Sequence, residues 1–355
     1  MNLDDLRAAV DSVDDRILDL LRERAELVGQ IGRLKEKSGG PYYAPEREDA
    51  LLRRLVSANK SPLPETSIRA IYREILSAMR ALEQTITVAY LGPRTTFSHQ
   101  AAARHFGSSV KFQPERTIPE VFEAVERGRA GYGVVPIENS LEGGVNATLD
   151  CFMDTAARIC AQTFLPVDLN LLGRVPVEKV RRVYSHPQPF GQCRRWLAAH
   201  LPSAECVEVS STARAAELAA SEEGAAAIAG DMAAAEFGLP VLARSIQDAT
   251  GNVTRFFVIG RQDTRPSGHD KTSVMFAVKD QPGALARALE PFEKSGISLT
   301  RIESRPSKRR PWEYYFFADF AGHSADPAVA GALAKLEGVC AFTRLLGSYP
   351  DVPAA

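Results

Sequence analysis

The chain has 355 residues, of which 45% are hydrophobic and 25% charged, and its 43 basic residues nearly balance its 44 acidic ones. This length and composition suit two or three globular domains, and the charge balance indicates no nucleic-acid partner. We find no basic-then-apolar targeting segment and no apolar run of roughly 18 residues, so we expect no membrane span. The five cysteines show no metal-ligand spacing, so we expect reduced thiols, no metal site and a cytoplasmic protein.

Residues 1–85 have the apolar spacing of α-helices. From Leu3 to Leu34, apolar residues recur three and four positions apart, a heptad pattern that predicts a helix roughly 48 Å long. The segment Gly39-Gly40-Pro41 predicts the end of this helix, and two shorter helices follow Pro45 and Pro64. A short helical hairpin cannot cover so long an apolar face, so we expect a homodimer or a higher homo-oligomer.

Charged residues occur where this helical region should be apolar. Arg24 takes the place of a leucine in the heptad, and Arg7, Lys35 and the pair Arg47-Glu48 lie on the same predicted helices. A single arginine could simply fix the helix register or extend its charged group to water. Several buried cations are costly unless an anion neutralises them, so we expect a dicarboxylate to bind among them.

Four segments of this region resemble the all-helical chorismate mutases: Leu6-Arg7, Arg-Ala-Glu-Leu at 24–27, Lys35 and Pro45-Glu46-Arg47-Glu48. The resemblance implies that Arg24, Lys35 and Arg47 bind the carboxylates and ether oxygen of chorismate. It also implies that Arg7 reaches the other subunit's site and that Glu48 binds the substrate hydroxyl. The rearrangement to prephenate needs no cofactor, only a held conformer and charge stabilisation.

Glu83 stands where some of these enzymes place a glutamine against the ether oxygen. A glutamate donates a hydrogen bond there only when it is protonated. We therefore expect mutase activity to rise toward acid pH and expect Glu83→Gln to flatten that profile. The alternative is that Glu83 is an exposed residue of the last helical turn.

Residues 86–262 alternate short β-rich runs with helical ones, which predicts an α/β domain of two lobes with a cleft, like that of periplasmic binding proteins. Ser98 and His99 are adjacent on a predicted helix, so they point in different directions and do not form a nucleophile–base pair. Instead, small polar residues recur at the turns between strands and helices. Each alone is more often a helix cap, but four such turns favour an anion-binding site.

Four segments of this region, VVPIENSLEGGV, YSHPQPFGQC, STARAA and NVTRFFVIG, resemble the prephenate dehydratases in sequence and order. The resemblance implies that Thr254 is the central catalytic residue, with its hydroxyl directed at the hydroxyl that leaves prephenate. The implied substrate-binding and supporting residues are Thr96, Ser98, Glu138, Asn139, Ser140, Ser185, Gln192, Arg255 and Phe256. Prephenate would lose CO2 and hydroxide to become phenylpyruvate, a reaction driven by aromatisation. Arogenate as substrate and a non-catalytic ligand-binding protein remain alternatives.

The loop GPRTTFSHQAA at 92–102 differs from the dehydratase pattern at one position, because Thr95 stands where glycine is typical. Glycine in such a turn often has a positive φ, and a β-branched residue there is strained. Three outcomes are open: the loop shifts, the Thr95 hydroxyl is used, or dehydratase activity is weakened.

Residues 263–271 have the composition of a linker, and residues 271–350 show the order βαββαβ of a ferredoxin-like module. The segments DQPGALARAL and TRIESRP resemble the ACT modules that bind phenylalanine at a subunit interface. The implied phenylalanine site comprises Gly283, Ala284, Leu285, Ser298, Glu303, Ser304, Arg305 and Pro306. Taken together, the three regions resemble a bifunctional chorismate mutase–prephenate dehydratase of phenylalanine biosynthesis, under feedback control by L-phenylalanine.

Overall fold

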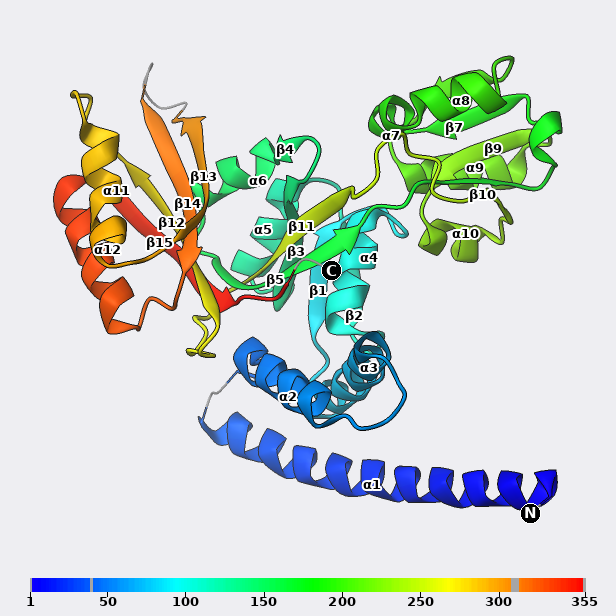
Figure 1. Ribbon diagram of the computed structural model, residues 1–355, viewed down its shortest axis with the longest axis horizontal. Helices are drawn as coiled ribbons and strands as arrows, with labels where there is room; N and C mark the ends of the chain where they lie inside the picture. Colours follow the sequence, from blue (N-terminus) through cyan, green and yellow to red (C-terminus); the bar gives the residue numbers. More distant parts are fainter. Residues whose placement is uncertain (1, 39–40, 308–312, 354–355) are drawn as a thin grey trace. The chain divides into compact units, whose positions relative to one another are not determined.

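The computed structural model describes residues 2–38, 41–307 and 313–353 (Figure 1). The chain divides into two compact units. One comprises Met1–Ala44, Leu51–Ile86 and Phe106–Lys111, and the other comprises Pro45–Ala50, Thr87–His105 and Phe112–Ala355. The predicted helix end at Gly39 and Gly40 lies outside the described residues. None of the described helices is long and apolar enough to cross a membrane.

The N-terminal region forms three helices, as the sequence predicts: α1 (Leu3–Ser38), α2 (Pro45–Ala58) and α3 (Glu65–Glu83). They make up most of the first unit, except that the start of α2, Pro45–Ala50, belongs to the second. The 36-residue α1 packs against α3, while much of its apolar stripe stays exposed in this single chain. The exposed residues of that stripe include Leu3, Leu6, Val10, Val13, Ile17, Leu20, Leu27 and Leu34. We call this stripe the α1 apolar face.

The first lobe of the α/β region is built on a sheet of order β2-β1-β3-β11-β5. Its strands are β1 (Thr87–Leu91), β2 (Lys111–Glu115), β3 (Tyr132–Asn139), β5 (Arg158–Pro166) and β11 (Val253–Gly260), with β4 (Gly143–Gly144) paired to β3. The helices of this lobe are α4 (Phe97–Phe106), α5 (Ile118–Glu126) and α6 (Asn146–Phe152).

The second lobe has its own sheet, of order β10-β6-β9-β7-β8. The strands are β6 (Asn170–Gly173), β7 (Arg182–Ser185), β8 (Glu205–Glu208), β9 (Ala225–Ala229) and β10 (Val241–Ala243). Its helices are α7 (Pro187–Gln192), α8 (Arg194–His200), α9 (Thr212–Ser221) and α10 (Asp231–Phe237), with a short 3-10 turn at Val177–Lys179. The chain crosses between the lobes twice, and the crossings are joined by a hydrogen bond from Val167 N to Asn252 O (2.8 Å). The predicted two-lobed α/β domain is therefore confirmed.

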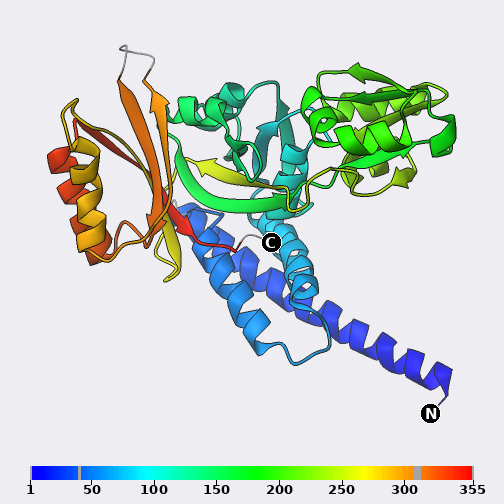
Figure 2. The ribbon, with the colours of Figure 1, turned by 45° about the horizontal axis from the view of Figure 1, so that its top comes forward.

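The C-terminal module has the predicted ferredoxin-like order, with strands β12 (Asp270–Ala277), β13 (Leu299–Pro306), β14 (Tyr314–Ala321) and β15 (Phe342–Pro350). Helices α11 (Ala284–Lys294) and α12 (Pro327–Val339) cover one face of its sheet (Figure 2). The opposite face packs on the first lobe, where Phe317 and Tyr349 share a core with Phe122, Phe152 and Phe257. A Cβ on Gly347 would collide with the backbone of Ile159, so β15 approaches β5 more closely than a side chain permits.

Candidate functional site

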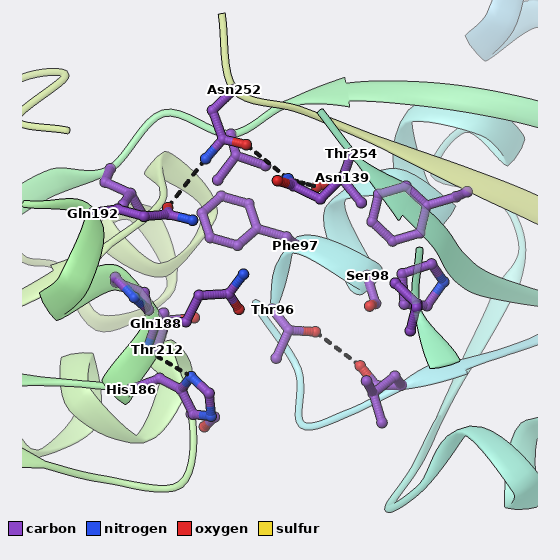
Figure 3. Close-up of a pocket in the computed structure, with 18 of the residues that line it drawn as sticks. Thr96, Phe97, Ser98, Asn139, His186, Gln188, Gln192, Thr212, Asn252 and Thr254 are labelled. Atoms are coloured by element: carbon purple, nitrogen blue, oxygen red, sulfur yellow. Dashed lines mark hydrogen bonds between the residues drawn. The ribbon is translucent and has the colours of Figure 1, made fainter. Parts of the chain in front are cut away.

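A cavity of about 350 Å³ lies between the two lobes of the α/β region (Figure 3). Its volume is within the range of small-molecule pockets, roughly 300–1,000 Å³. The polar residues that line it are Thr96, Ser98, Asn139, His186, Gln188, Gln192, Ser210, Ser211, Thr212, Asn252 and Thr254. Both lobes contribute polar groups, as expected for a site in the cleft of a two-lobed domain.

Strand β11 presents Thr254 and Phe256 to this cavity. Thr254 lies opposite Asn139 on β3, and Arg255 lies opposite Glu138. Because successive side chains of a strand point to opposite faces, Arg255 points away from the cavity. The pairing between β11 and β3 shifts in register between Arg255 and Phe256 of β11.

A chain of amide hydrogen bonds runs along the cavity wall (Figure 3). Asn139 Nδ2 donates to Thr254 Oγ1 (2.9 Å) and to Asn252 Oδ1 (2.7 Å). Asn252 Nδ2 donates to Gln192 Oε1 (3.1 Å), and Gln192 Nε2 donates to Glu142 Oε1 (2.8 Å). Thr254 thus accepts a hydrogen bond, which leaves its hydroxyl hydrogen to be donated elsewhere.

The N-termini of α4 and α9, one from each lobe, lie at the cavity. Thr96 caps α4, because its Oγ1 accepts a hydrogen bond from His99 N (3.3 Å) and donates to Leu91 O (3.0 Å). Ser211 caps α9 by accepting from Arg214 N (3.0 Å). Helix N-termini attract anions, and no Lys or Arg lines the cavity among the described residues. The site can therefore bind a carboxylate through helix starts and hydroxyls.

Thr95 has a φ of 66°, in the left-handed region that favours glycine. Its N–H donates to His99 Nδ1 (3.1 Å), and its hydroxyl donates to Arg94 O (2.6 Å), so the hydroxyl is engaged by the backbone. The His99 ring stacks on Tyr90, with the ring centroids 4.6 Å apart. Burial lowers the pKa of His99, Arg94 lowers it further, and Glu236 opposes the shift. A neutral ring keeps Nδ1 as the acceptor that holds Thr95.

The structure brings six of the predicted substrate and catalytic residues to the cavity: Thr96, Ser98, Asn139, Gln192, Thr254 and Phe256. Ser140 instead accepts from Val253 N (3.0 Å) and donates to Gly251 O (3.0 Å). Ser185 is fully buried and donates to Ile228 O (3.2 Å). Glu138 faces two arginines, Arg255 (3.8 Å) and Arg301 (3.4 Å).

Several lining residues were not predicted as part of the site, namely Phe97, Gln188, Ser210, Ser211, Thr212 and Asn252. The motifs STARAA and NVTRFFVIG contain three of these residues, so a signal for them was present in the sequence. His186 caps α7 by accepting a hydrogen bond from Gln188 N at Nδ1, and it also lines the cavity.

Arg255 connects the first lobe to the C-terminal module. Its guanidinium is buried and donates to Asp319 (2.6 Å), to the Tyr349 hydroxyl (3.0 Å) and to Gln162 (2.9 Å). Ser273 completes the cluster by donating to Asp319 (2.6 Å). Burial lowers the pKa of Arg255, but its electrostatic interactions with Tyr349 and Asp319 outweigh it and raise the pKa overall. The guanidinium therefore stays charged within a buried hydrogen-bond cluster.

In the helical unit, Lys35 and Glu83 form an ion pair of 2.7 Å, with only 8% of the Glu83 side chain exposed. Arg24 Nη1 is buried and has no hydrogen-bond partner among the described residues. A buried donor without an acceptor is rare, and an anionic ligand would satisfy it. The remaining predicted mutase residues are Arg7 and Arg47, which are exposed, and Glu48, which is half-buried in the first turn of α2.

In the C-terminal module, Gly283 precedes α11 with a φ of 75°, a conformation that suits glycine. Strand β13 directs Glu303 toward Gly144, where a Cβ would collide with its carboxylate. Arg305 donates from Nη2 to both oxygens of Asp150 (2.8 and 2.9 Å). The other predicted residues of this site are exposed or half-buried: Ala284, Leu285, Ser298, Ser304 and Pro306.

Three family models match the chain: chorismate mutase type II over residues 6–84, prephenate dehydratase over 88–264 and the ACT domain over 272–338. The bifunctional chorismate mutase/prephenate dehydratase of Aquifex aeolicus is 48% identical over 353 residues, which is 98% of each chain. That of Stutzerimonas stutzeri is 46% identical over 352 residues, covering 97% of this chain and 96% of the relative. The prephenate dehydratase from Arthrobacter aurescens, solved with L-Phe, is 37% identical with a TM-score of 0.70, covering 76% and 93% of the two chains.

Proposed function

The chain belongs to the bifunctional chorismate mutase/prephenate dehydratase family, and we propose that the cavity between its α/β lobes is the prephenate site. It is an enzyme that rearranges chorismate to prephenate and converts prephenate to phenylpyruvate. The observation that supports the assignment of the site is the direction of the hydrogen bond at Thr254. Its hydroxyl accepts from Asn139 beside the cavity, so its hydrogen is available to a leaving group.

The dehydratase reaction breaks two bonds of prephenate. The ring C–C bond to the carboxylate breaks to release CO2, and its electron pair enters the ring as the C–O bond to the hydroxyl breaks. The departing oxygen takes one proton and leaves as water, so the reaction consumes one proton overall. Aromatisation drives it, and Thr254 need only stabilise the leaving oxygen as a hydrogen-bond donor.

Prephenate carries two carboxylates, and the site binds them without a cationic side chain among the described lining residues. The N-termini of α4 and α9 approach from opposite lobes, where Ser98 and Thr212 add hydroxyl donors. We assign one carboxylate to each helix start.

The mutase reaction is assigned to the helical residues. The partnerless Arg24 Nη1 supports a role for Arg24 in binding a carboxylate of chorismate. Lys35, which pairs with Glu83, would contact the ether oxygen of chorismate, where negative charge develops as the C–O bond breaks. Arg7, Arg47 and Glu48 complete the proposed set, with Arg7 acting in the partner's site.

The C-terminal module is proposed to bind L-phenylalanine and to inhibit the dehydratase. Support comes from the ACT family match and from the dehydratase of Arthrobacter aurescens, which was solved with L-Phe. The proposed contacts are Gly283, Ala284, Leu285, Ser298, Glu303, Ser304, Arg305 and Pro306. The cluster around Arg255 offers a physical link, because it joins the strand of Thr254 to this module.

The α1 apolar face supports a homodimer or higher homo-oligomer, since a second copy would remove this surface from water. We also propose a cytoplasmic location, with each of the five cysteines a free thiol.

One experiment tests these assignments together. The purified protein is incubated separately with chorismate, prephenate and arogenate, with and without L-phenylalanine, and the products are identified by chromatography. We expect phenylpyruvate from chorismate and from prephenate, less of it when L-phenylalanine is present, and little product from arogenate. Formation of phenylalanine from arogenate as the main reaction would contradict the proposed substrate.

A further inference from the structure

We propose that Asn252 and Glu142 are positioning residues for the dehydratase reaction, which fix the direction of the Thr254 hydroxyl through a one-way chain of hydrogen bonds. The inference rests on the proposed role of Thr254 as the donor to the leaving hydroxyl. Neither residue touches the reacting atoms in this account. Each acts through the orientation of a neighbouring amide.

One end of the chain is fixed by the backbone. The N–H groups of Leu141 and Glu142 donate to Asn139 Oδ1 (3.0 and 3.2 Å). A backbone N–H can only donate, so the oxygen of the Asn139 amide must face it. The amide nitrogen then faces Thr254 and Asn252, and both of its hydrogens are used.

The other end is fixed by a carboxylate. An ionised Glu142 side chain can only accept, so Gln192 must turn its nitrogen toward it. The oxygen of Gln192 then faces Asn252, whose nitrogen donates to it and whose oxygen is left to accept from Asn139. The two ends therefore require the same direction for the three amides between them, those of Asn139, Asn252 and Gln192, which Figure 3 shows.

This direction decides what Thr254 can do. With the nitrogen of Asn139 facing it, Thr254 Oγ1 accepts and its hydrogen points elsewhere. No other hydrogen bond of this hydroxyl occurs among the described residues, and the side chain lines the cavity. If the Asn139 amide were reversed, its oxygen would accept a hydrogen bond from the Thr254 hydroxyl, which could then no longer donate to the substrate.

Burial strengthens the part of the chain formed by Asn139 and Asn252, whereas the link from Gln192 to Glu142 is exposed. Asn252 is 3% exposed and Asn139 is 9% exposed, so water competes little for their hydrogen bonds. Asn252 lies on a crossing between the lobes, while Gln192 belongs to α7 in the second lobe. The orientation of Thr254 in the first lobe is thus set partly by the second.

The test reverses one link and then restores it. In Asn252→Asp, the new carboxylate still accepts from Asn139 but cannot donate to Gln192. Gln192 must then turn its amide nitrogen toward the new carboxylate at position 252. This turn brings the Gln192 oxygen against the carboxylate of Glu142. The repulsion between this oxygen and Glu142 should pull the carboxylate at position 252 away from Asn139 and weaken the hydrogen bond from Asn139 to Thr254. We therefore expect dehydratase kcat to fall roughly 10- to 100-fold. KM should also rise, because the new carboxylate lines a cavity proposed for a substrate with two carboxylates.

Adding Glu142→Gln supplies a donor for the reversed Gln192 oxygen. The double variant Asn252→Asp/Glu142→Gln therefore completes the chain again, with Asn139 still donating to Thr254. We expect its kcat to return to within a few-fold of the parent, whereas Glu142→Gln alone loosens the chain and lowers kcat only about two- to threefold. A purely structural role for Asn252 would not be rescued by a change at Glu142.

The matched control is Asn170→Asp. Asn170 is another buried asparagine, 1% exposed, whose amide donates to Asp231 (3.0 Å) and is not joined to Thr254. We expect its dehydratase kcat to stay within a few-fold of the parent. Parent-like kcat in Asn252→Asp, or a double variant no better than that single variant, would overturn the inference.

Thr254→Ala in the same series separates this inference from the proposed function. If Thr254→Ala loses turnover but Asn252→Asp keeps it, only the positioning role fails. If the parent converts no prephenate, the proposed function fails. Chorismate turnover, measured in every variant, reports active protein concentration.

Discussion

Arg255 and Asp319 form a buried ion pair of 2.6 Å that joins the strand of Thr254 to the C-terminal module. Only 8% of the Arg255 side chain and 3% of the Asp319 side chain are exposed. Because Arg255 directly follows Thr254 in β11, a shift of the C-terminal sheet would reach Thr254 through one peptide unit. The pair is thus a direct connection between the proposed sensor and the proposed site.

The first prediction concerns this pair. Asp319→Asn leaves the Arg255 charge buried with a weaker partner, which is costly, and should weaken the coupling between the module and β11. We expect the L-phenylalanine concentration for half-maximal dehydratase inhibition to rise at least about fivefold. The control Asp263→Asn removes an exposed ion pair with Arg158 (3.6 Å) and should leave the inhibition curve unchanged. Parent-like inhibition of Asp319→Asn would show that the signal takes another route.

The second prediction concerns Thr95, whose φ of 66° places a β-branched residue in a left-handed turn. Such a conformation costs roughly 1–2 kcal/mol, partly offset in Thr95→Gly by the freedom that glycine gains in the unfolded chain. We expect Thr95→Gly to raise the thermal midpoint slightly and to raise dehydratase kcat/KM, because the turn that presents Thr96 relaxes. Ser245→Gly, at a φ of 50° in the second lobe, should affect stability without changing kcat/KM. A lower kcat/KM in Thr95→Gly would show that the Thr95 side chain is used.

The third prediction concerns pH. Since burial lowers the pKa of His99 in the folded state, the unfolded chain binds a proton at a higher pH than the folded chain does. His99 therefore stabilises the fold fully above its unfolded pKa of roughly 6.5, and this contribution is lost as pH falls below that value. Arg94, which lowers the pKa, and Glu236, which raises it, are the charged groups acting on His99, and Tyr90 stacks on its ring.

We expect His99→Asn, whose side-chain oxygen can accept from Thr95 N, to lose less thermal stability than the parent between about pH 7.5 and 5.5. The thermal midpoint measured by circular dichroism across this range checks the prediction. An equal or steeper loss in the variant would refute it.

The fourth prediction concerns the ion pair of Lys35 and Glu83. Glu83→Gln replaces the carboxylate with an amide that donates at every pH, so we expect the mutase kcat/KM profile to become flat. Dehydratase turnover should stay unchanged, because Glu83 belongs to the helical unit. A mutase profile that superimposes on the parent's would rule out a role for the protonation of Glu83.

Much of the fold could be predicted because local patterns determine it. The three-and-four spacing from Leu3 to Leu34 predicted α1, and the alternation of strands and helices predicted the two lobes and the ferredoxin-like module. The motifs also pointed to Thr254 and Asn139, which the structure brings face to face on β11 and β3.

The orientation of individual side chains was harder to predict from the sequence. The resemblance of NVTRFFVIG to the dehydratases placed Arg255 among the substrate-binding and supporting residues, although strand alternation directs it to the opposite face. The role inferred for Asn252 depends on the amides of Asn139 and Gln192, which are far away in sequence. A single sequence holds no record of the direction of such a chain, since an amide can donate or accept on either side.

The most direct test of the account is the pair of turnover rates of Thr254→Ala, measured with chorismate and with prephenate in the same preparation. Loss of the hydroxyl donor should lower phenylpyruvate formation at least about 100-fold, while chorismate consumption stays at the parent rate. Thr254→Ser keeps the hydroxyl and should retain most of the dehydratase activity. Undiminished phenylpyruvate formation by Thr254→Ala would contradict the central claim that this hydroxyl assists the leaving group.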